Sequence, residues 1–215
     1  MEKLVESLKQ LMGDITSNDK IKVSVAEIKP AYSQNDLREY QQALNIVYSN
    51  ELLTFYSLLG EINLEWGVNK TVFNGVIDED DLRYLSGRMR LLNPFEMIMG
   101  PGGNRWKDIL WFDETEAYIR DDIRRFVPFD LPSPEIIIGF RKEENIVTNK
   151  LYILDGRETS SSYRMSFEQY LIHLIKTKAF LYWQEIYDDR NSEEFKRFIT
   201  CMPLLFDDFD SNFFK

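Results

Sequence analysis

Residues 51–67, ELLTFYSLLGEINLEWG, join a helical pattern directly to a strand pattern, and this joint constrains the fold more than any other feature. The helix should end at Gly60, because a glycine after the last periodic residue is a common stop signal. Its apolar face consists of Leu52, Tyr56 and Leu59. Residues 62–66 then read as a short strand that carries Trp66. The joint therefore predicts a helix packed onto the sheet that this strand enters.

Helix signals precede this joint. The first segment has helical spacing through Met12, and Gly13 is the expected stop. A further helix should begin near Ser33, with Asp36 three residues later as its capping partner. The chain therefore opens on helices, separated by an extended segment that ends at Pro30.

Strand signals fill the middle of the chain. The expected strands are residues 21–25, 62–66, 71–77 and 108–112, with a hairpin formed by residues 135–141 and 149–155. A turn should lie at residues 67–69. Residues 91–99 are apolar but contain Pro94, which suits an edge or broken strand. These segments are short, and most follow one another without an intervening long helix.

Helix signals return towards the C-terminus. Asp113 and Glu116 resemble a helix start, with apolar residues at helical spacing up to Phe126. The clearest helix begins at a capping box formed by Ser166 and Gln169, and its apolar pattern extends through residues 183–186. After residue 189 we expect one short helix and then an acidic, aromatic tail.

This order predicts an α+β fold, with a mostly antiparallel sheet of short strands flanked by N-terminal and C-terminal helices. A chain of 215 residues is long for one average domain and short for two. We expect an N-terminal helix and extended lead-in over residues 1–30, a main domain over residues 31–189, and a C-terminal extension over residues 190–215. We expect that extension to dock on the same domain, and the alternatives are that it docks on a partner or is mobile.

Composition limits the compartment and the partner. Cys201 is the only cysteine, which excludes an internal disulfide framework and fits a reducing compartment. No stretch has the run of apolar residues that a secretory signal or a membrane span needs, so we expect a cytoplasmic protein without membrane association. The formal charge of −10 argues against nucleic-acid binding. An acidic surface could instead attract a basic protein, or it could simply keep the chain in solution.

The residue patterns do not indicate catalysis or a cofactor. His173 is the only histidine and lies within the strongest helix pattern, where a catalytic pairing with Cys201 would be a coincidence. Residues 78–81, DEDD, lack the spacing of a calcium loop, and a solvated acidic loop explains them better. Residues 100–104, GPGGN, precede a strand pattern, whereas a phosphate cradle would precede a helix. We therefore expect neither a bound metal nor a cofactor.

The order of elements resembles the SUKH superfamily of cell-wall-regulator-like and bacterial immunity proteins over residues 33–187. The residues that carry the resemblance are the joint with Trp66, the segment LLNPFEMI, the segment VPFDLPS, the central hairpin and the closing helix MSFEQYLIHLIKTKAFLYW. The chain departs from the family in lacking the usual Leu-Pro pair before the joint, and Leu59-Gly60 replaces the usual Asn-Gly.

The resemblance implies a non-enzymatic module that binds another protein. Many bacterial relatives are immunity proteins that neutralise a toxin, often a nuclease, and we expect this chain to occlude a basic toxin. The alternatives are a regulatory scaffold of the same fold and a metal-dependent enzyme that uses the carboxylate clusters. The candidate partner-binding residues are Asp78, Glu79, Asp80, Asp81, Asp113, Glu114, Glu116, Asp207, Asp208 and Asp210.

Overall fold

The structure, a computed structural model, describes residues 1–72, 84–100, 106, 124–134, 136–155, 158–184 and 189–214. Within these residues, the strands form one sheet in the order β1-β2-β3-β4-β5-β6-β7, with every neighbouring pair antiparallel. The strands are β1 (Ile21–Ile28), β2 (Ile62–Val68), β3 (Ser86–Leu91), β4 (Phe126–Asp130), β5 (Ile136–Glu143), β6 (Ile146–Asp155) and β7 (Glu158–Ser166). The helices are α1 (Glu2–Ser17), α2 (Gln34–Leu44), α3 (Asn50–Leu58), α5 (Pro94–Met99), α8 (Phe167–Lys176), α10 (Glu193–Leu205) and the 3₁₀ helix η3 (Ser211–Phe214).

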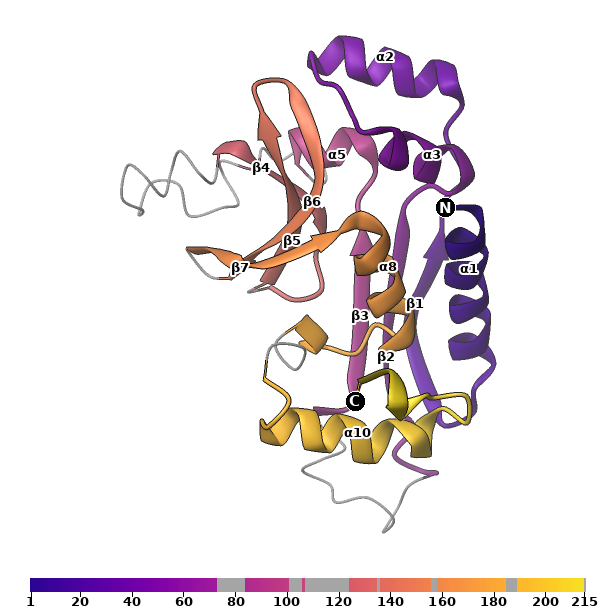
Figure 1. Cartoon of the computed structure of the whole chain (residues 1–215). Helices are drawn as coiled ribbons and strands as arrows, with labels where there is room; N and C mark the ends of the chain where they lie inside the picture. The colour runs from indigo at the N-terminus through magenta and orange to yellow at the C-terminus, as the bar shows by residue number, and fades with distance from the viewer. Residues whose placement is uncertain are drawn as a thin grey trace.

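The sheet has two halves that meet at one residue pair. In the described residues, β3 and β4 pair only at Leu91 and Asp130, and Figure 1 shows β1–β3 and β4–β7 running in different directions on the two sides of this junction. In β2 the alternate side chains of residues 62, 64, 66 and 68 are buried, so one face of the first half covers the core. Helices α1 and α8 lie side by side against this half (Figure 1). The predicted α+β class with flanking helices is confirmed.

A turn of unusual backbone geometry covers the edge of β3 that β4 leaves open. The N–H of Arg88 donates to the carbonyl of Ala179 over 2.8 Å, and the N–H of Leu181 donates to the carbonyl of Ser86 over 2.9 Å. Ala179 and the preceding Lys178 have left-handed φ angles of 54° and 56°, and Tyr182 further along the turn has one of 62°. This turn interrupts the predicted continuation of α8, which stops at Lys176; residues 183 and 184 are helical again after the turn, and residues 185 and 186 lie outside the described residues.

Two glycines have different roles from those expected. Gly13 does not stop α1, which continues to Ser17 because buried Ile15 extends its apolar face. The α3 helix ends at Leu58, and the next residue, Leu59, has an extended backbone, so Gly60 is not the cap of this helix. A Cβ at Gly60 would lie 2.3 Å from the carbonyl oxygen of Pro30, so the close approach of the two backbones requires glycine there.

Other expectations on the middle of the chain are corrected. Pro94 begins helix α5, where its missing N–H costs nothing, and the Asn93 side chain caps the helix by accepting from the N–H of Glu96. Residues 67 and 68 belong to β2, and the turn follows at residues 69–72. Phe126 begins β4 and does not lie in a helix, although residues 124 and 125 just before it are helical. Residues 113–123 of that expected helix, residues 73–77 and the strand at 108–112 lie outside the described residues.

The capping predictions and the hairpin are confirmed. Ser33 with Asp36 opens α2 and Ser166 with Gln169 opens α8, each as a complete capping box. Strands β5 and β6 form the predicted hairpin, with only residues 144 and 145 between them. The helix expected after residue 189 is α10, which is longer than predicted because Pro203 lies within its last turn.

Candidate functional site

The predicted partner-binding acids fall into two groups. Residues 78–81 and Asp113, Glu114 and Glu116 lie outside the described residues. The acids of the tail are described, and they contact their own chain. Asp207 pairs with Lys20 at 2.8 Å, Asp208 pairs with Lys178 at 2.5 Å, and an oxygen of Asp210 accepts from the N–H of Asn212 at 3.0 Å.

The tail aromatics pack against the rest of the fold. Phe206 and Phe214 are buried, and Phe209 and Phe213 are partly buried against the same core. The Phe206 ring meets Trp66 edge-on with a centroid separation of 5.4 Å. The tail acids therefore hold a packed segment in place, and a partner that used Asp207 or Asp208 would compete with an internal ion pair.

His173 and Cys201 have structural surroundings. The His173 ring stacks on Trp183 at 5.9 Å, and its Nδ1 lies 2.8 Å from the carbonyl oxygen of Gln169. Burial lowers the pKa of His173 below the ordinary value of 6.5. Cys201 is buried in α10. Within the described part of the chain, no group of three or more His, Cys, Asp and Glu side chains could hold a metal ion, and no helix is long and apolar enough to cross a membrane.

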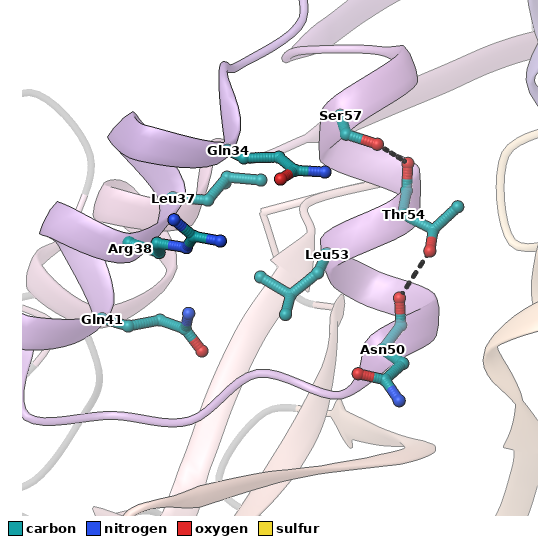
Figure 2. Close-up of a pocket in the computed structure, with 8 residues that line it drawn as sticks. All are labelled: Gln34, Leu37, Arg38, Gln41, Asn50, Leu53, Thr54 and Ser57. Carbon is teal, nitrogen blue, oxygen red and sulfur yellow. Dashed lines mark hydrogen bonds between the residues drawn. The ribbon is translucent and has the colours of Figure 1, made fainter.

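A groove of about 330 Å³ lies between α2 and α3. Both helices are amphipathic, because each packs an apolar stripe on the core and begins at a serine cap. Figure 2 shows that they run in opposite directions, that Gln34, Leu37, Arg38 and Gln41 point from α2 towards α3, and that Leu53 points back from α3, whereas the side chain of Thr54 points away from α2. Helix α2 contributes Gln34, Leu37, Arg38 and Gln41, and helix α3 contributes Asn50, Leu53, Thr54 and Ser57.

The groove presents hydrogen-bonding groups of fixed orientation. The Oε1 atom of Gln41 accepts from the N–H of Tyr48 at 3.0 Å, so its Nε2 is left as a donor. The hydroxyls of Thr54 and Ser57 donate to the carbonyl oxygens of Asn50 and Thr54, each over 2.8 Å, so their oxygens are left as acceptors (Figure 2). Two leucines lie between these polar groups. The site can therefore take a ligand with both polar and apolar parts.

Arg38 is the one charged side chain among the described residues of the groove. It makes no hydrogen bond or ion pair with any described residue, and it is exposed. The positions that could pair with it along the helix, three and four residues away, are Gln34, Asn35, Gln41 and Gln42. Because all four are carboxamides, Arg38 has no partner on its own helix, and none among the other described residues, in a chain of formal charge −10.

An exposed apolar surface borders the same end of the molecule, where Figure 1 places α2, α3, α5 and the tip of the β5–β6 hairpin together. We call this the helical-end surface. Its apolar members are Val47, Phe95, Met99 and Ile146. Val47 and Ile146 form a parallel bridge, and the N–H of Val47 donates to the carbonyl oxygen of Asn145 over 2.7 Å.

The two parts of the helical-end surface are linked through Tyr48. Its hydroxyl donates to the carbonyl oxygen of Pro94 over 2.6 Å, so the buried Tyr48 side chain reaches from the residue after Val47 to the first residue of α5. The exposed acids Glu51, Glu143 and Glu144 flank the Val47–Ile146 pair in the chain, with Lys142 as the nearest cation of the hairpin. An exposed apolar patch with a polar border is a candidate protein-binding surface.

Sequence reasoning missed both the groove and the helical-end surface. The four carboxamides around Arg38 were a visible signal, since they exclude the intrahelical ion pairs that usually occupy an arginine. Searches of protein-family models, curated proteins and solved structures found no significant match to this chain.

Proposed function

We propose that this chain is a non-enzymatic protein-binding module of the SUKH type, and that it acts as an immunity protein that occludes a basic toxin. The resemblance of residues 33–187 to that superfamily supports the class of function. The observation that carries the proposal is the helical-end surface, where exposed apolar side chains of two separate elements lie within an acidic border.

The exposures favour docking there. Ile146 is 52% exposed and Val47 is 46% exposed, although each belongs to a residue type that is usually buried. A protein interface typically places such side chains at its centre and charged groups at its rim. The acids Glu143 and Glu144 at the hairpin tip would speed association with a basic partner and make the rate salt-dependent.

The test is rescue from toxicity. Products of the genes adjacent to this one are expressed singly in a host, with and without this chain, and growth is measured. We expect one product to be toxic alone and harmless with this chain, and to form a stable complex in gel filtration. Absence of rescue and of any complex would contradict the proposal.

The surface is tested with two matched variants. Ile146→Lys places a charge in the helical-end surface, and we expect it to weaken the complex at least about tenfold. Leu204→Lys is the control, because Leu204 has a comparable exposure of 42% and lies on α10, at the other end of the molecule (Figure 1). Equal affinities for the two variants would exclude the helical-end surface as the interface.

A further inference from the structure

We propose that the groove between α2 and α3 binds an extended peptide segment that carries a carboxylate, with Arg38 as the paired cation. This inference does not depend on the proposed toxin partner. It rests on the groove itself, on the absence of a partner for Arg38 among the described residues, and on the hydrogen-bonding groups that surround that side chain.

The charge of the groove selects an anion of single charge. Arg38 is the one charged lining residue among those described, and no carboxylate lines the groove there. A guanidinium binds a carboxylate through two parallel hydrogen bonds, which suits one negative charge. The two helices are antiparallel, so each end of the groove combines a helix N-terminus with a helix C-terminus, and neither end adds a net field for a multiply charged phosphate (Figure 2).

The remaining polar groups match a peptide backbone. The side chains of Gln34 and Asn50 make no hydrogen bond with any described residue, so both carboxamides can donate and accept. The Gln41 amide offers a donor, and the hydroxyl oxygens of Thr54 and Ser57 offer acceptors. A ligand with alternating N–H and C=O groups satisfies such a mixed set, whereas a free inorganic anion would use only the donors.

The floor and the size of the groove define the rest of the ligand. Leu37 is buried and Leu53 is half-buried between the polar groups, so they offer an apolar contact beside Arg38. A volume of about 330 Å³ lies at the small end of ligand sites and admits a few side chains of an extended segment. A short sequence of one acidic residue between aliphatic residues therefore fits the groove.

The experiment is a titration of the ¹⁵N-labelled full chain, followed by amide chemical shifts. The probes are acetyl-Leu-Glu-Leu-amide, the same peptide with Gln in place of Glu, acetyl-Leu-Leu-Leu with a free C-terminal carboxylate, and acetate. We expect shifts over residues 34–41 and 50–57 with at least one of the two peptides that carry a carboxylate. The probe that binds more tightly identifies a side-chain or a terminal carboxylate as the source.

Three results would overturn the inference at this stage. The first is the absence of shifts in α2 and α3 with both carboxylate peptides. The second is binding of the Gln peptide as tight as that of the tighter carboxylate peptide. The third is binding of acetate as tight as that of the same peptide, which would remove the peptide backbone from recognition.

Variants test the role of Arg38. Arg38→Gln should weaken binding of the carboxylate peptide by about tenfold or more, since it removes a charge-assisted pair, and Arg38→Lys should weaken it less. The control is Lys70→Gln, which makes the same change in net charge at an exposed residue beyond the far end of β2. Arg38 is exposed, so its variants should keep the wild-type spectrum away from the groove. Unchanged affinity in Arg38→Gln would refute the pairing.

Discussion

Asp130 is a fully buried carboxyl at the junction of the two halves of the sheet, and its titration should be visible in the stability of the protein. One of its oxygens accepts from the N–H of Arg90 at 2.7 Å, and the other accepts from the hydroxyl of Tyr170 at 2.5 Å. Burial raises the pKa of Asp130 to about 6 from 3.8, against these hydrogen bonds and the charge of Arg88, which lower it.

The sign and size of the effect follow from linkage. Because the folded state has the higher pKa, it binds the proton more tightly than the unfolded chain does, and the stabilisation from this proton is lost as the pH rises through about 6. The difference between the folded-state pKa of about 6 and the ordinary pKa of 3.8 corresponds to about 3 kcal/mol in the free energy of unfolding, over the full range from protonated to ionised Asp130. Between pH 7.5 and pH 4.5, acidification should add about 2 kcal/mol to the free energy of unfolding through Asp130 alone.

The assay compares the wild type with Asp130→Asn, which can still accept from Arg90 and can donate to the oxygen of Tyr170. Urea unfolding at a series of pH values gives the difference in stability between the two proteins. Other groups titrate alike in both, so this difference should shift by about 2 kcal/mol in favour of the wild type on going from pH 7.5 to pH 4.5. A difference that is independent of pH would refute the reasoning. Tyr170→Phe should move the transition to higher pH, because it removes a hydrogen bond to the charged form.

Four further predictions concern stability and titration. Gly13→Ala should raise the free energy of unfolding by about 0.5–1 kcal/mol, because Gly13 is exposed inside α1 and no atom lies within 4 Å of the added Cβ. Gly60→Ala should lower the free energy of unfolding, because its Cβ would lie 2.3 Å from the Pro30 oxygen. Thermal unfolding tests both variants. Phe214→Ala should lower the free energy of unfolding in urea by about 3 kcal/mol. A change smaller than the experimental error would show that the tail contributes little to the core. The imidazole of His173 should titrate below pH 6.5 in NMR spectra, and its neutral burial should reduce stability as the pH falls through that range.

The sequence predicts those elements whose signals are local. Capping by Ser33 and Ser166 depends on residues three positions away, and both boxes form as expected. The segment at Pro94 has two local solutions, because a proline suits a broken strand as well as the first position of a helix. The helix forms because Asn93 caps it and Met97 is buried, and the second of these reasons depends on tertiary packing.

Strands β4 and β7 could not be predicted in this way. Strand β4 contains Pro128, which discourages a strand assignment, yet it pairs with Gly139 of β5 at a position where a bulge follows. Strand β7 is polar, with the sequence ETSSSYRMS, and it exists because β6 offers a free edge beside it. Lys178 and Ala179 likewise adopt left-handed conformations, although neither is the glycine or asparagine that would indicate a turn in the sequence. In each case a neighbouring strand determines the conformation.

The groove depends both on the local sequence of α2 and on the tertiary arrangement of α2 and α3, so the sequence carries only part of the signal for it. The absence of a carboxylate beside Arg38 is encoded locally in α2, but the groove also needs α3 to face α2, and this depends on the connection between them and on the contact of α2 with α5. Asn45 leaves α2 in a left-handed conformation with a φ of 49°, and Val47 then joins the β5–β6 hairpin by donating to Asn145 and accepting from Val147 at 2.9 Å. The connection is thus attached to the hairpin. The same bridge exposes Val47 and Ile146 on the helical-end surface, so one short segment positions both candidate sites, and loss of its pairing with the hairpin should alter both together.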